Sequence, residues 1–257
     1  LSTGLVSASA TDLGYSYASE LKGFRGLEAR GEMAGPVAAF IPVDEGFSEQ
    51  WHLDNPKFEL GGVDINITEI WDEYTGDGVK LGIIDDGIDY THSDLSENYL
   101  FDMDFDALGQ ALGDGSDDAR ASEYNWHGTA VAGIMAAPFD DGDVVGVAPD
   151  ASFAMLRMGM GFDASATQTE AVLNQMVNFD VVNNSWNYGE AFSDNKTELK
   201  FNDMFDAITA AVTEGRPTDD GALGSVVVFA AGNYGEDGDS SNYHSFTSTH
   251  ETISVGS

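Results

Sequence analysis

Residues able to perform acid–base chemistry stand beside hydrophobic runs in this sequence. Two acidic residues, Asp85 and Asp86, directly follow such a run, and His127 precedes the small residues 128–133, which favour a closely packed helix. A buried carboxylate on one imidazole nitrogen fixes the tautomer, so that the other nitrogen can take a proton from a nucleophile. Asn233 follows another hydrophobic run, and its amide can donate to a developing oxyanion. Taken singly, each residue is also explained as a turn former or a surface residue.

Hydrophobic runs and helical patterns alternate from residue 79 onward, as is typical of parallel strands joined by crossover helices. The predicted strands are residues 79–84, 152–158, 180–183, 225–230 and 252–255. The predicted helices are residues 128–137, 167–177 and 199–212. We therefore predict an α/β fold with a doubly wound, mostly parallel sheet and helices on both faces. The carboxyl ends of such strands share one edge, where α/β folds place their functional groups.

The length of 257 residues suits one large domain, which we expect in residues 40–257. Residues 1–39 show few hydrophobic runs, and Ser, Ala, Thr and Gly dominate their first half. We interpret residues 1–39 as an N-terminal extension, a linker or a remnant of a pro-segment.

The composition excludes several classes of partner. The sequence contains 45 Asp and Glu against 10 Lys and Arg, a formal net charge of −35. Nucleic acids and anionic membranes bind through Lys and Arg, so neither is an expected partner. With 42% hydrophobic and 11% aromatic residues, the chain should nevertheless fold. We expect bound cations, calcium first, or high ambient salt to offset the repulsion between carboxylates.

The sequence has no cysteine, which excludes disulfides, thiolate zinc sites and cysteine nucleophiles. It also has no apolar run of about 18 residues, the length needed to span a bilayer. The sequence begins with Leu rather than Met. We expect an upstream leader and a secreted or extracellular protein, with the periplasm or the cell surface as alternatives.

The order Asp, His, Asn on successive strand ends resembles the subtilisin-like serine proteases, over most of the sequence from about residue 44 onward. The kexin and furin branch is the most similar, on four pairs of residues: Gln50-Trp51, Asp85-Asp86, Ser185-Trp186 and Asp239-Ser240. The resemblance implies that Asp85 orients the imidazole, that His127 is the general base and that Asn233 donates to the oxyanion. It also implies a peptide or protein substrate.

The serine nucleophile of that family lies in a Gly-Thr-Ser turn after the asparagine, and these 257 residues contain no such turn. We therefore expect the N-terminal portion of a peptidase domain, with a sheet incomplete at its C-terminal end. The serine would come from later residues of a longer polypeptide or from a second, associated chain. The expected function is a calcium-dependent serine endopeptidase, inactive without that serine. The alternatives are a catalytically inactive pseudoprotease and a calcium-stabilised peptide-binding module.

The resemblance also implies a structural calcium site with Asp44, Asp94 and Asp141 as side-chain ligands, because hard oxygen donors suit Ca²⁺. Surface acids in an acidic protein are the alternative. A second candidate calcium cluster consists of three alternating acids, Asp102, Asp104 and Asp106. A solvated acidic loop explains this second cluster equally well.

In the resembled branch, two acids line the primary pocket and select Arg or Lys before the scissile bond. Those positions hold Glu190 and His244 here, and an imidazole in place of an acid weakens the attraction for a buried guanidinium. The resemblance also implies that Asp86 favours a basic residue one position further back, and that Glu190 with Asp239 can hold a calcium ion at the pocket floor.

A short segment is expected to pair with the extended backbone of the substrate: Ser185, Trp186 and Asn187. A residue of the hydrophobic core is the alternative interpretation of Trp186.

Overall fold

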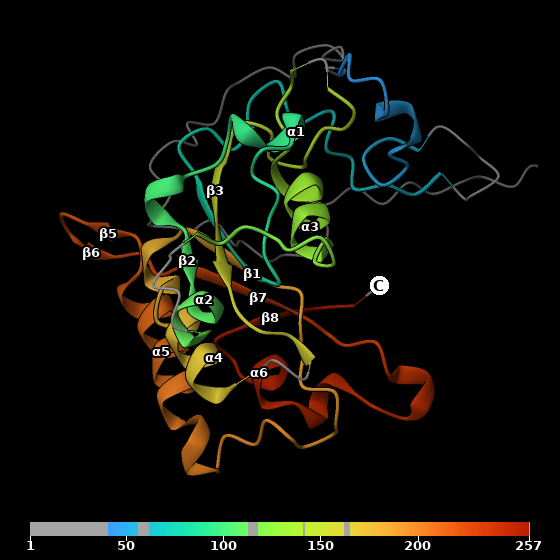
Figure 1. The fold of residues 1–257 in the computed structure, drawn as a ribbon. Helices are drawn as coiled ribbons and strands as arrows, with labels where there is room; N and C mark the ends of the chain where they lie inside the picture. The colour runs from blue at the N-terminus through green and yellow to red at the C-terminus, as the bar shows by residue number, and fades with distance from the viewer. Residues whose placement is uncertain (1–40, 56–61, 113–117, 141, 162–164, 257) are drawn as a thin grey trace, which may run out of the picture. The chain divides into compact units, whose positions relative to one another are not determined.

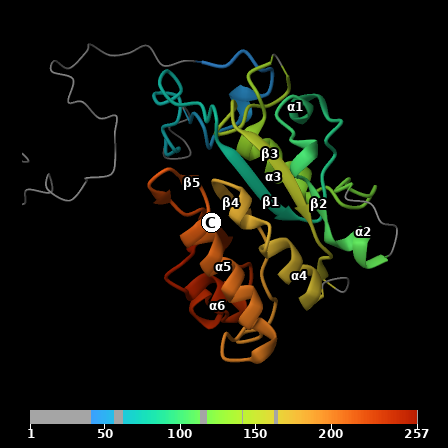
Figure 2. The ribbon, with the colours of Figure 1, turned by 90° about the vertical axis from the view of Figure 1, so that its left-hand side faces the viewer.

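The computed structural model describes residues 41–55, 62–112, 118–140, 142–161 and 165–256. A six-stranded sheet with the order β2-β3-β1-β4-β7-β8 organises this part of the chain, and every pair of neighbouring strands is parallel. The strands are β1 (Lys80–Asp85), β2 (Phe105–Asp106), β3 (Ser152–Arg157), β4 (Val181–Asn184), β7 (Val226–Ala230) and β8 (Ile253–Val255). Figure 2 shows β3 beside β1, running in the same direction. The chain places β3 on one side of β1 and β4 on the other, so the winding reverses at β1.

Helices cover both faces of the sheet (Figure 1). They are α1 (Ser93–Ser96), α2 (Ala107–Leu112), α3 (His127–Ala136), α4 (Ala166–Leu173), α5 (Asn202–Glu214) and α6 (Ser245–Ser248). On one face, Ala132 of α3 belongs to a buried cluster with Ile83 of β1. On the other face, Val172 of α4 and Ile208 of α5 belong to a cluster with Phe229 of β7. The predicted α/β fold with a doubly wound parallel sheet is confirmed.

The main elements follow from burial patterns in the sequence. β1 is buried at every residue after Lys80, as expected for a central strand covered on both faces. α5 buries four residues at helical spacing, Met204, Ala207, Ile208 and Ala211. Ser165 caps the N-terminus of α4, because its side chain accepts a hydrogen bond from the backbone N–H of Gln168 at 3.2 Å.

The predicted boundaries of the five strands differ from the observed ones by one residue at most. The predicted helix 167–177 is divided, because α4 ends at Leu173 and a separate 3-10 helix covers Met176–Asn178. The sequence did not predict β2 or the small antiparallel hairpin of β5 (Pro217–Thr218) and β6 (Gly221–Ala222). Two-residue strands are too short to produce a periodic pattern.

Residues before β1 pack on the loop that follows α3. Trp71 donates from Nε1 to the backbone oxygen of Val147 at 3.0 Å. Gln50 donates to the backbone oxygen of Val145 at 2.8 Å and accepts from its N–H at 3.0 Å. The backbone N–H of Glu45 also donates to the backbone oxygen of Gly142. Together, these bonds hold the segment that contains Asp44 against residues 142–147.

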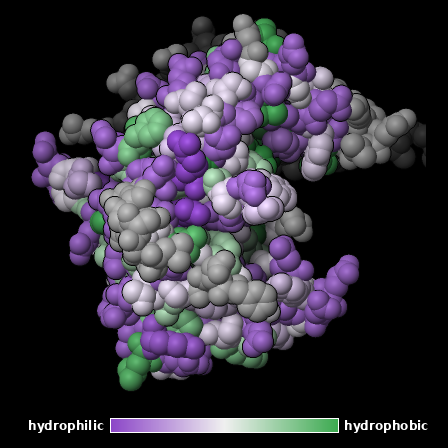
Figure 3. Space-filling view, in the orientation of Figure 1, coloured by the Kyte–Doolittle hydropathy of each residue, from purple (hydrophilic) through white to green (hydrophobic). Residues whose placement is uncertain are grey.

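Hydrophilic residues dominate the face of the molecule drawn in Figure 3, in agreement with the acidic composition. Within the described ranges, none of the helices has the length and apolar character needed to cross a membrane. The predicted N-terminal extension, residues 1–39, lies outside the described residues.

Candidate functional site

Asp85 and His127, which are 42 residues apart in the sequence, form a direct pair at the carboxyl edge of the sheet. Asp85 ends β1 and is 1% exposed, and His127 is the first residue of α3. Nδ1 of His127 lies 2.8 Å from Oδ1 and 2.9 Å from Oδ2 of Asp85. Because a carboxylate only accepts hydrogen bonds, Nδ1 carries the hydrogen and Nε2 is left to accept a proton. The His127 side chain is 50% exposed, so another group can reach Nε2.

The charge of Asp85 depends on its burial. Desolvation raises the pKa of the Asp85 carboxyl to about 6, and the hydrogen bond from His127 opposes this rise. The backbone N–H of Asp86 also donates to Oδ1 of Asp85, at 2.8 Å. Asp85 is therefore mostly ionised at neutral pH and can stabilise a protonated His127.

Glycine at position 128 allows α3 to approach β1 closely. A Cβ on Gly128 would lie 2.3 Å from the backbone oxygen of Gly87 and 3.1 Å from Cβ of Asp85. A larger residue would therefore push the start of α3, with His127, away from the strand.

Asp86 binds the same end of α3. Its Oδ1 accepts a hydrogen bond from the backbone N–H of Gly128 at 2.9 Å, and Asn125 Nδ2 lies 3.4 Å from Oδ2. A carboxylate in this position satisfies a free N–H of the first helical turn and interacts favourably with the helix dipole. The structure thus places Asp86, which was predicted to contact substrate, at the start of the helix that carries His127.

Arg157 and Asp106 support the turn after β1, and the sequence did not predict this role for either. Arg157 donates from Nε to the backbone oxygen of Asp86 at 3.2 Å and forms an ion pair with Asp106 at 3.0 Å. Both side chains are largely buried, at 15% and 2% exposure. In the sequence, each of these residues appears only as a charged residue at the end of a strand. Their pairing could not be predicted, because two charges 51 positions apart give no local pattern.

Asn233 lies on the exposed turn after β7, at the same edge of the sheet as Asp85. This placement follows because β1, β4 and β7 are parallel neighbours, whose carboxyl ends meet at one edge. Gly232 has a φ of +100°, a conformation that favours glycine, and it turns the chain sharply before Asn233. The exposed Asn233 side chain is available to a ligand at this edge.

The predicted substrate-pairing segment follows β4. Ser185 accepts a hydrogen bond from Asn183 Nδ2 at 2.9 Å. The Trp186 ring packs edge-on against Phe229 and Phe246, with ring centroids 5.3 and 5.9 Å apart. Trp186 therefore packs on the hydrophobic core, although its buried Nε1 has no hydrogen-bond partner within the described part of the chain.

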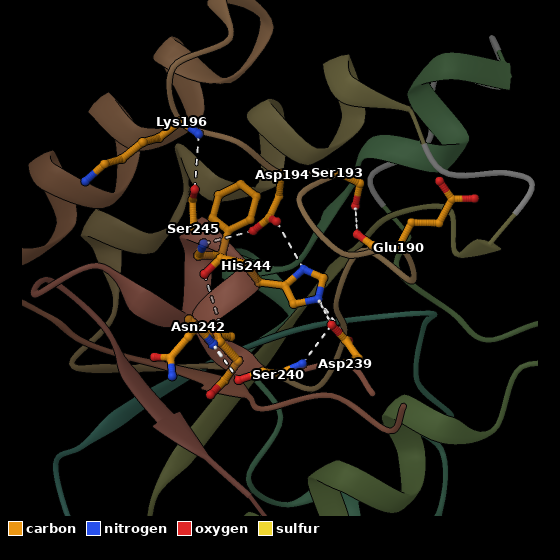
Figure 4. A network of polar contacts seen from close by, with 12 residues as sticks. Glu190, Ser193, Asp194, Lys196, Asp239, Ser240, Asn242, His244 and Ser245 are labelled. Carbon is orange, nitrogen blue, oxygen red and sulfur yellow. Dashed lines mark hydrogen bonds and ion pairs between the residues drawn. The ribbon is translucent and has the colours of Figure 1, made fainter. Parts of the chain in front are cut away.

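Of the two predicted pocket positions, His244 is buried and Glu190 is exposed. Figure 4 shows the His244 imidazole between two carboxylates, with Glu190 pointing away from it. Nδ1 lies 3.1 Å from Oδ1 of Asp194, and Nε2 lies 3.0 Å from Oδ2 of Asp239. The hydrogen bond from His244 lowers the pKa of Asp239. Sequence reasoning missed Asp194, which is 1% exposed, because no motif surrounds it.

Two of the three acids predicted to bind a structural calcium contact residues 142–144. Asp44 is 5% exposed and Asp94 is 2% exposed. Asp94 Oδ2 accepts from the backbone N–H groups of Asp143 and Val144 at 3.1 Å each. Burial raises the pKa of the Asp44 carboxyl, and nearby Asp140 adds to the rise. The third predicted ligand, Asp141, lies outside the described residues.

The surroundings of Asp44 fit a cation. Both of its carboxylate oxygens are buried and have no hydrogen-bond partner among the residues that the structure describes. A buried carboxylate without partners is costly, and a Ca²⁺ ion coordinated by oxygen donors would remove that cost. Within the same described ranges, no three His, Cys, Asp or Glu side chains are arranged to hold a metal ion by themselves. Backbone oxygens of the loop would therefore have to contribute.

The structure does not bring the other predicted calcium ligands together. Asp102 is exposed, Asp104 accepts a hydrogen bond from Tyr99 at 3.1 Å, and Asp106 pairs with Arg157. Asp239 directs both oxygens to His244, and Glu190 lies away from it.

A hollow of about 300 Å³ lies beside Asn233, lined also by Ser185, Asn183 and Val228. Asn183 stands in register with Ile83 of β1 and with Val228 of β7, so this hollow is on the α3 side of the sheet. A larger hollow of about 830 Å³ lies along α3, and its lining does not include His127.

Comparisons with known proteins all find proteases of one family. Residues 76–257 match the Subtilase family. Protease KEX1 of Kluyveromyces lactis is 33% identical over 213 residues, covering 82% of this chain and 26% of that protein. The dibasic-processing endoprotease of Schizosaccharomyces pombe is 34% identical over 217 residues, covering 82% and 28%. Furin-like protease 2 of Drosophila melanogaster is 34% identical over 222 residues, covering 85% and 12%. The chain spans about a quarter of the length of the first two relatives.

Solved structures agree with this similarity. A protease from Pseudoalteromonas arctica superimposes with a TM-score of 0.63 at 26% identity, covering 83% of this chain and 65% of that one. The serine protease of Aeromonas sobria in complex with its chaperone shares the fold, with a TM-score of 0.62 at 20% identity, covering 75% and 32%. With the family match over residues 76–257 and the relatives in the kexin and furin group, the chain belongs to the Subtilase family.

Proposed function

We propose that this chain forms part of a calcium-dependent serine endopeptidase that hydrolyses peptide bonds in peptide or protein substrates. The observation that carries the proposal is the contact of Nδ1 of a half-exposed His127 with the buried carboxylate of Asp85 at 2.8 Å. This arrangement is the one that an imidazole needs in order to act as a general base.

The mechanism uses three residues of this chain and one serine from outside these 257 residues. The serine hydroxyl attacks the substrate carbonyl, and its proton passes to Nε2 of His127. Asp85 accepts the Nδ1 hydrogen bond throughout and stabilises the imidazolium. The Asn233 amide donates to the oxyanion, and His127 then returns the proton to the leaving amine as the peptide bond breaks.

We propose that the segment carrying the serine binds in the hollow beside Asn233. This hollow lies on the α3 side of the sheet, where His127 begins its helix, and its lining contains the ends of β7 and β8. A segment seated there would bring a hydroxyl to the side from which Nε2 can be reached. The segment belongs to a longer polypeptide or to an associated chain.

Calcium is proposed as a structural ion held by Asp44, Asp94 and backbone oxygens near residue 142. When bound, Ca²⁺ supplies positive charge that compensates the buried carboxylates. Asp44 and Asp94 then fix the loop between α3 and β3, and α3 positions His127. The location proposed with this calcium dependence is secreted or extracellular, with the periplasm or cell surface as variants of it.

The test is hydrolysis of unstructured peptides by the complete polypeptide that contains this chain. His127→Ala should reduce kcat by about 10⁴-fold or more, because the base is removed. Asn233→Leu should reduce kcat by about 10²- to 10³-fold with little change in KM, since its hydrogen bond forms mainly in the transition state. Asn178→Leu, at an exposed position far from the sheet edge, is the matched control. Equal activity of native protein and His127→Ala would reject the mechanism, and absence of hydrolysis by the native protein would favour a peptide-binding module.

A further inference from the structure

A buried histidine, His244, connects the segment after β4 with the turn after β7 (Figure 4). Its side chain is 2% exposed, and Nδ1 lies 3.1 Å from Oδ1 of Asp194 in the first segment. Nε2 lies 3.1 and 3.0 Å from the two carboxylate oxygens of Asp239, at the end of the turn. With a hydrogen on each nitrogen, the ring donates to both acids. The ring then carries one positive charge between two carboxylates, so the network keeps one net negative charge.

The family resemblance implies instead that Asp239 holds a calcium ion together with Glu190, and the structure does not fit that ion. Asp239 directs both of its oxygens to Nε2 of His244, while Glu190 is exposed and points away. The second oxygen of Asp194 accepts from the backbone N–H of Phe246 at 3.0 Å. The imidazole therefore stands where a cation bound to Asp239 would have to stand.

Asp239 lies next to both sequence neighbours of Asn233. Its backbone N–H donates to the backbone oxygen of Tyr234 at 3.1 Å. Its Oδ2 lies 4.0 Å from the point where a Cβ of Gly232 would stand. Residues 233–238 are all exposed, so side-chain packing does little to hold this turn. Its position therefore depends on the hydrogen bonds at Asp239, where the turn meets the buried network.

Two other hydrogen bonds join the same segments without involving Asp239. The backbone N–H of Phe192 donates to the backbone oxygen of Tyr243 at 3.1 Å. The backbone N–H of Lys196 donates to Oγ of Ser245, also at 3.1 Å. These bonds attach residues 243 and 245, whereas the His244 ring reaches the end of the turn that carries Asn233.

We propose that His244, and not a metal ion, anchors the turn that presents the Asn233 amide to the oxyanion. Asp194 fixes one nitrogen of the ring, and the other nitrogen fixes Asp239 through a charge-assisted hydrogen bond. His244 is a positioning residue, because it acts on the reaction through Asn233. The inference rests on the proposed function, since it assigns His244 a part in the same reaction.

The first experiment measures peptide hydrolysis by the complete calcium-loaded polypeptide with His244→Gln or Asp239→Asn. Each variant should lower kcat by about 10- to 100-fold and leave KM within about twofold, because the Asn233 hydrogen bond forms mainly in the transition state. In an Asn233→Leu background, neither change should lower kcat by more than about twofold, since the amide that they position is already absent. Ser245→Ala removes the bond from Lys196 and is the matched control, which should keep the native kcat.

Two results of this experiment would overturn the inference. An unchanged kcat in both variants would show that the network does not position Asn233, and a full further loss in the Asn233→Leu background would show that it acts elsewhere. If His244→Gln fails to fold, Asp239→Asn tests the same hydrogen bond from its other partner. Absence of hydrolysis by the native protein would reject the proposed function, and the assigned role in that reaction with it.

The second experiment needs no activity and separates the imidazole from a metal ion. Calorimetric titration with calcium, together with Tm at several calcium concentrations, compares the native polypeptide with Asp239→Asn. We expect the same number of bound calcium ions and the same calcium-dependent rise in Tm, because His244 holds Asp239. Asp44→Asn, which changes a proposed calcium ligand, should lose most of the rise. Loss of a bound calcium ion in Asp239→Asn would overturn the inference and leave the proposed function intact.

Discussion

Asp85 lies in an environment that opposes its own charge. Its 1% exposure removes water from the carboxylate, while His127 and the backbone N–H of Asp86 donate hydrogen bonds to it. The balance leaves the pKa of Asp85 at about 6. The residue proposed to orient the base is therefore sensitive to mild acid.

The sign of this shift determines how Asp85 affects stability. The folded chain binds the Asp85 proton more tightly than the unfolded chain does. The contribution of this proton to the free energy of unfolding is therefore full below about pH 4 and is lost as the pH rises through about 6. Asp85→Asn removes this titration. Relative to the native chain, the free energy of unfolding of the variant should rise by on the order of 2 kcal/mol between about pH 4 and pH 7.

Urea denaturation at fixed pH values measures this difference. Asp219→Asn, which changes an exposed acid in the β5–β6 hairpin, is the control. Its free energy of unfolding should differ from that of the native chain by the same amount at each pH. A pH-independent difference for Asp85→Asn would contradict the raised pKa.

At the scale of elements, one arginine holds the ends of three strands together. Arg157 at the end of β3 donates to the backbone of Asp86, just after β1, and pairs with Asp106 at the end of β2. The turn that follows Asp85 is thereby fixed from the neighbouring strand. This turn also carries the Asp86 carboxylate that binds the first turn of α3.

Removal of Arg157 should destabilise the chain strongly. Arg157→Met leaves Asp106, at 2% exposure, as a buried charge without its ion-pair partner, and we expect a loss of about 3 kcal/mol in the free energy of unfolding. Arg216→Met is the matched control, because Arg216 and Asp180 are 36% and 31% exposed and their pair should contribute less than about 1 kcal/mol. Equal losses in urea denaturation would contradict the supporting role of Arg157.

The sequence predicted the elements better than the contacts between them. The strand ending at Asp85 and the helix beginning at His127 were both evident from hydrophobic runs and small residues. Their proximity was expected from the order of the motifs and from the family resemblance. The pairs Arg157–Asp106 and His244–Asp194 were not predicted, because ion pairs between residues about 50 positions apart leave no periodic signal. The family resemblance assigned Asp86 to the substrate, and this stays a prediction. Its hydrogen bond from Gly128 was not predicted, because that bond depends on the close approach of α3 to β1.

At the scale of the whole molecule, carboxylates outnumber basic residues, and the formal net charge is −35. Repulsion of this size weakens the folded state unless cations are bound. Asp44, at 5% exposure, is the acid most dependent on such a cation within the described residues, because both of its buried carboxylate oxygens have no hydrogen-bond partner there.

Calcium should therefore raise the melting temperature, Tm, and chelation should lower it. At a free calcium concentration of about 100 times Kd, binding adds about 2.7 kcal/mol to the free energy of unfolding. Asp44→Asn should abolish most of the calcium-dependent shift, whereas Asp203→Asn, at an exposed position in α5, should retain it. Sodium chloride of equal ionic strength separates a specific site from general screening. An identical Tm in calcium and in excess chelator would count against the site.

The proposed mechanism requires that Asp85 and His127 activate a serine outside these 257 residues. Labelling of the complete polypeptide that contains this chain with a fluorophosphonate probe, followed by peptide mapping, identifies that serine. We expect one labelled serine, in a segment that is continuous or associated with this chain, and loss of labelling in His127→Ala. Labelling of no serine, or labelling that persists in His127→Ala, would contradict the mechanism.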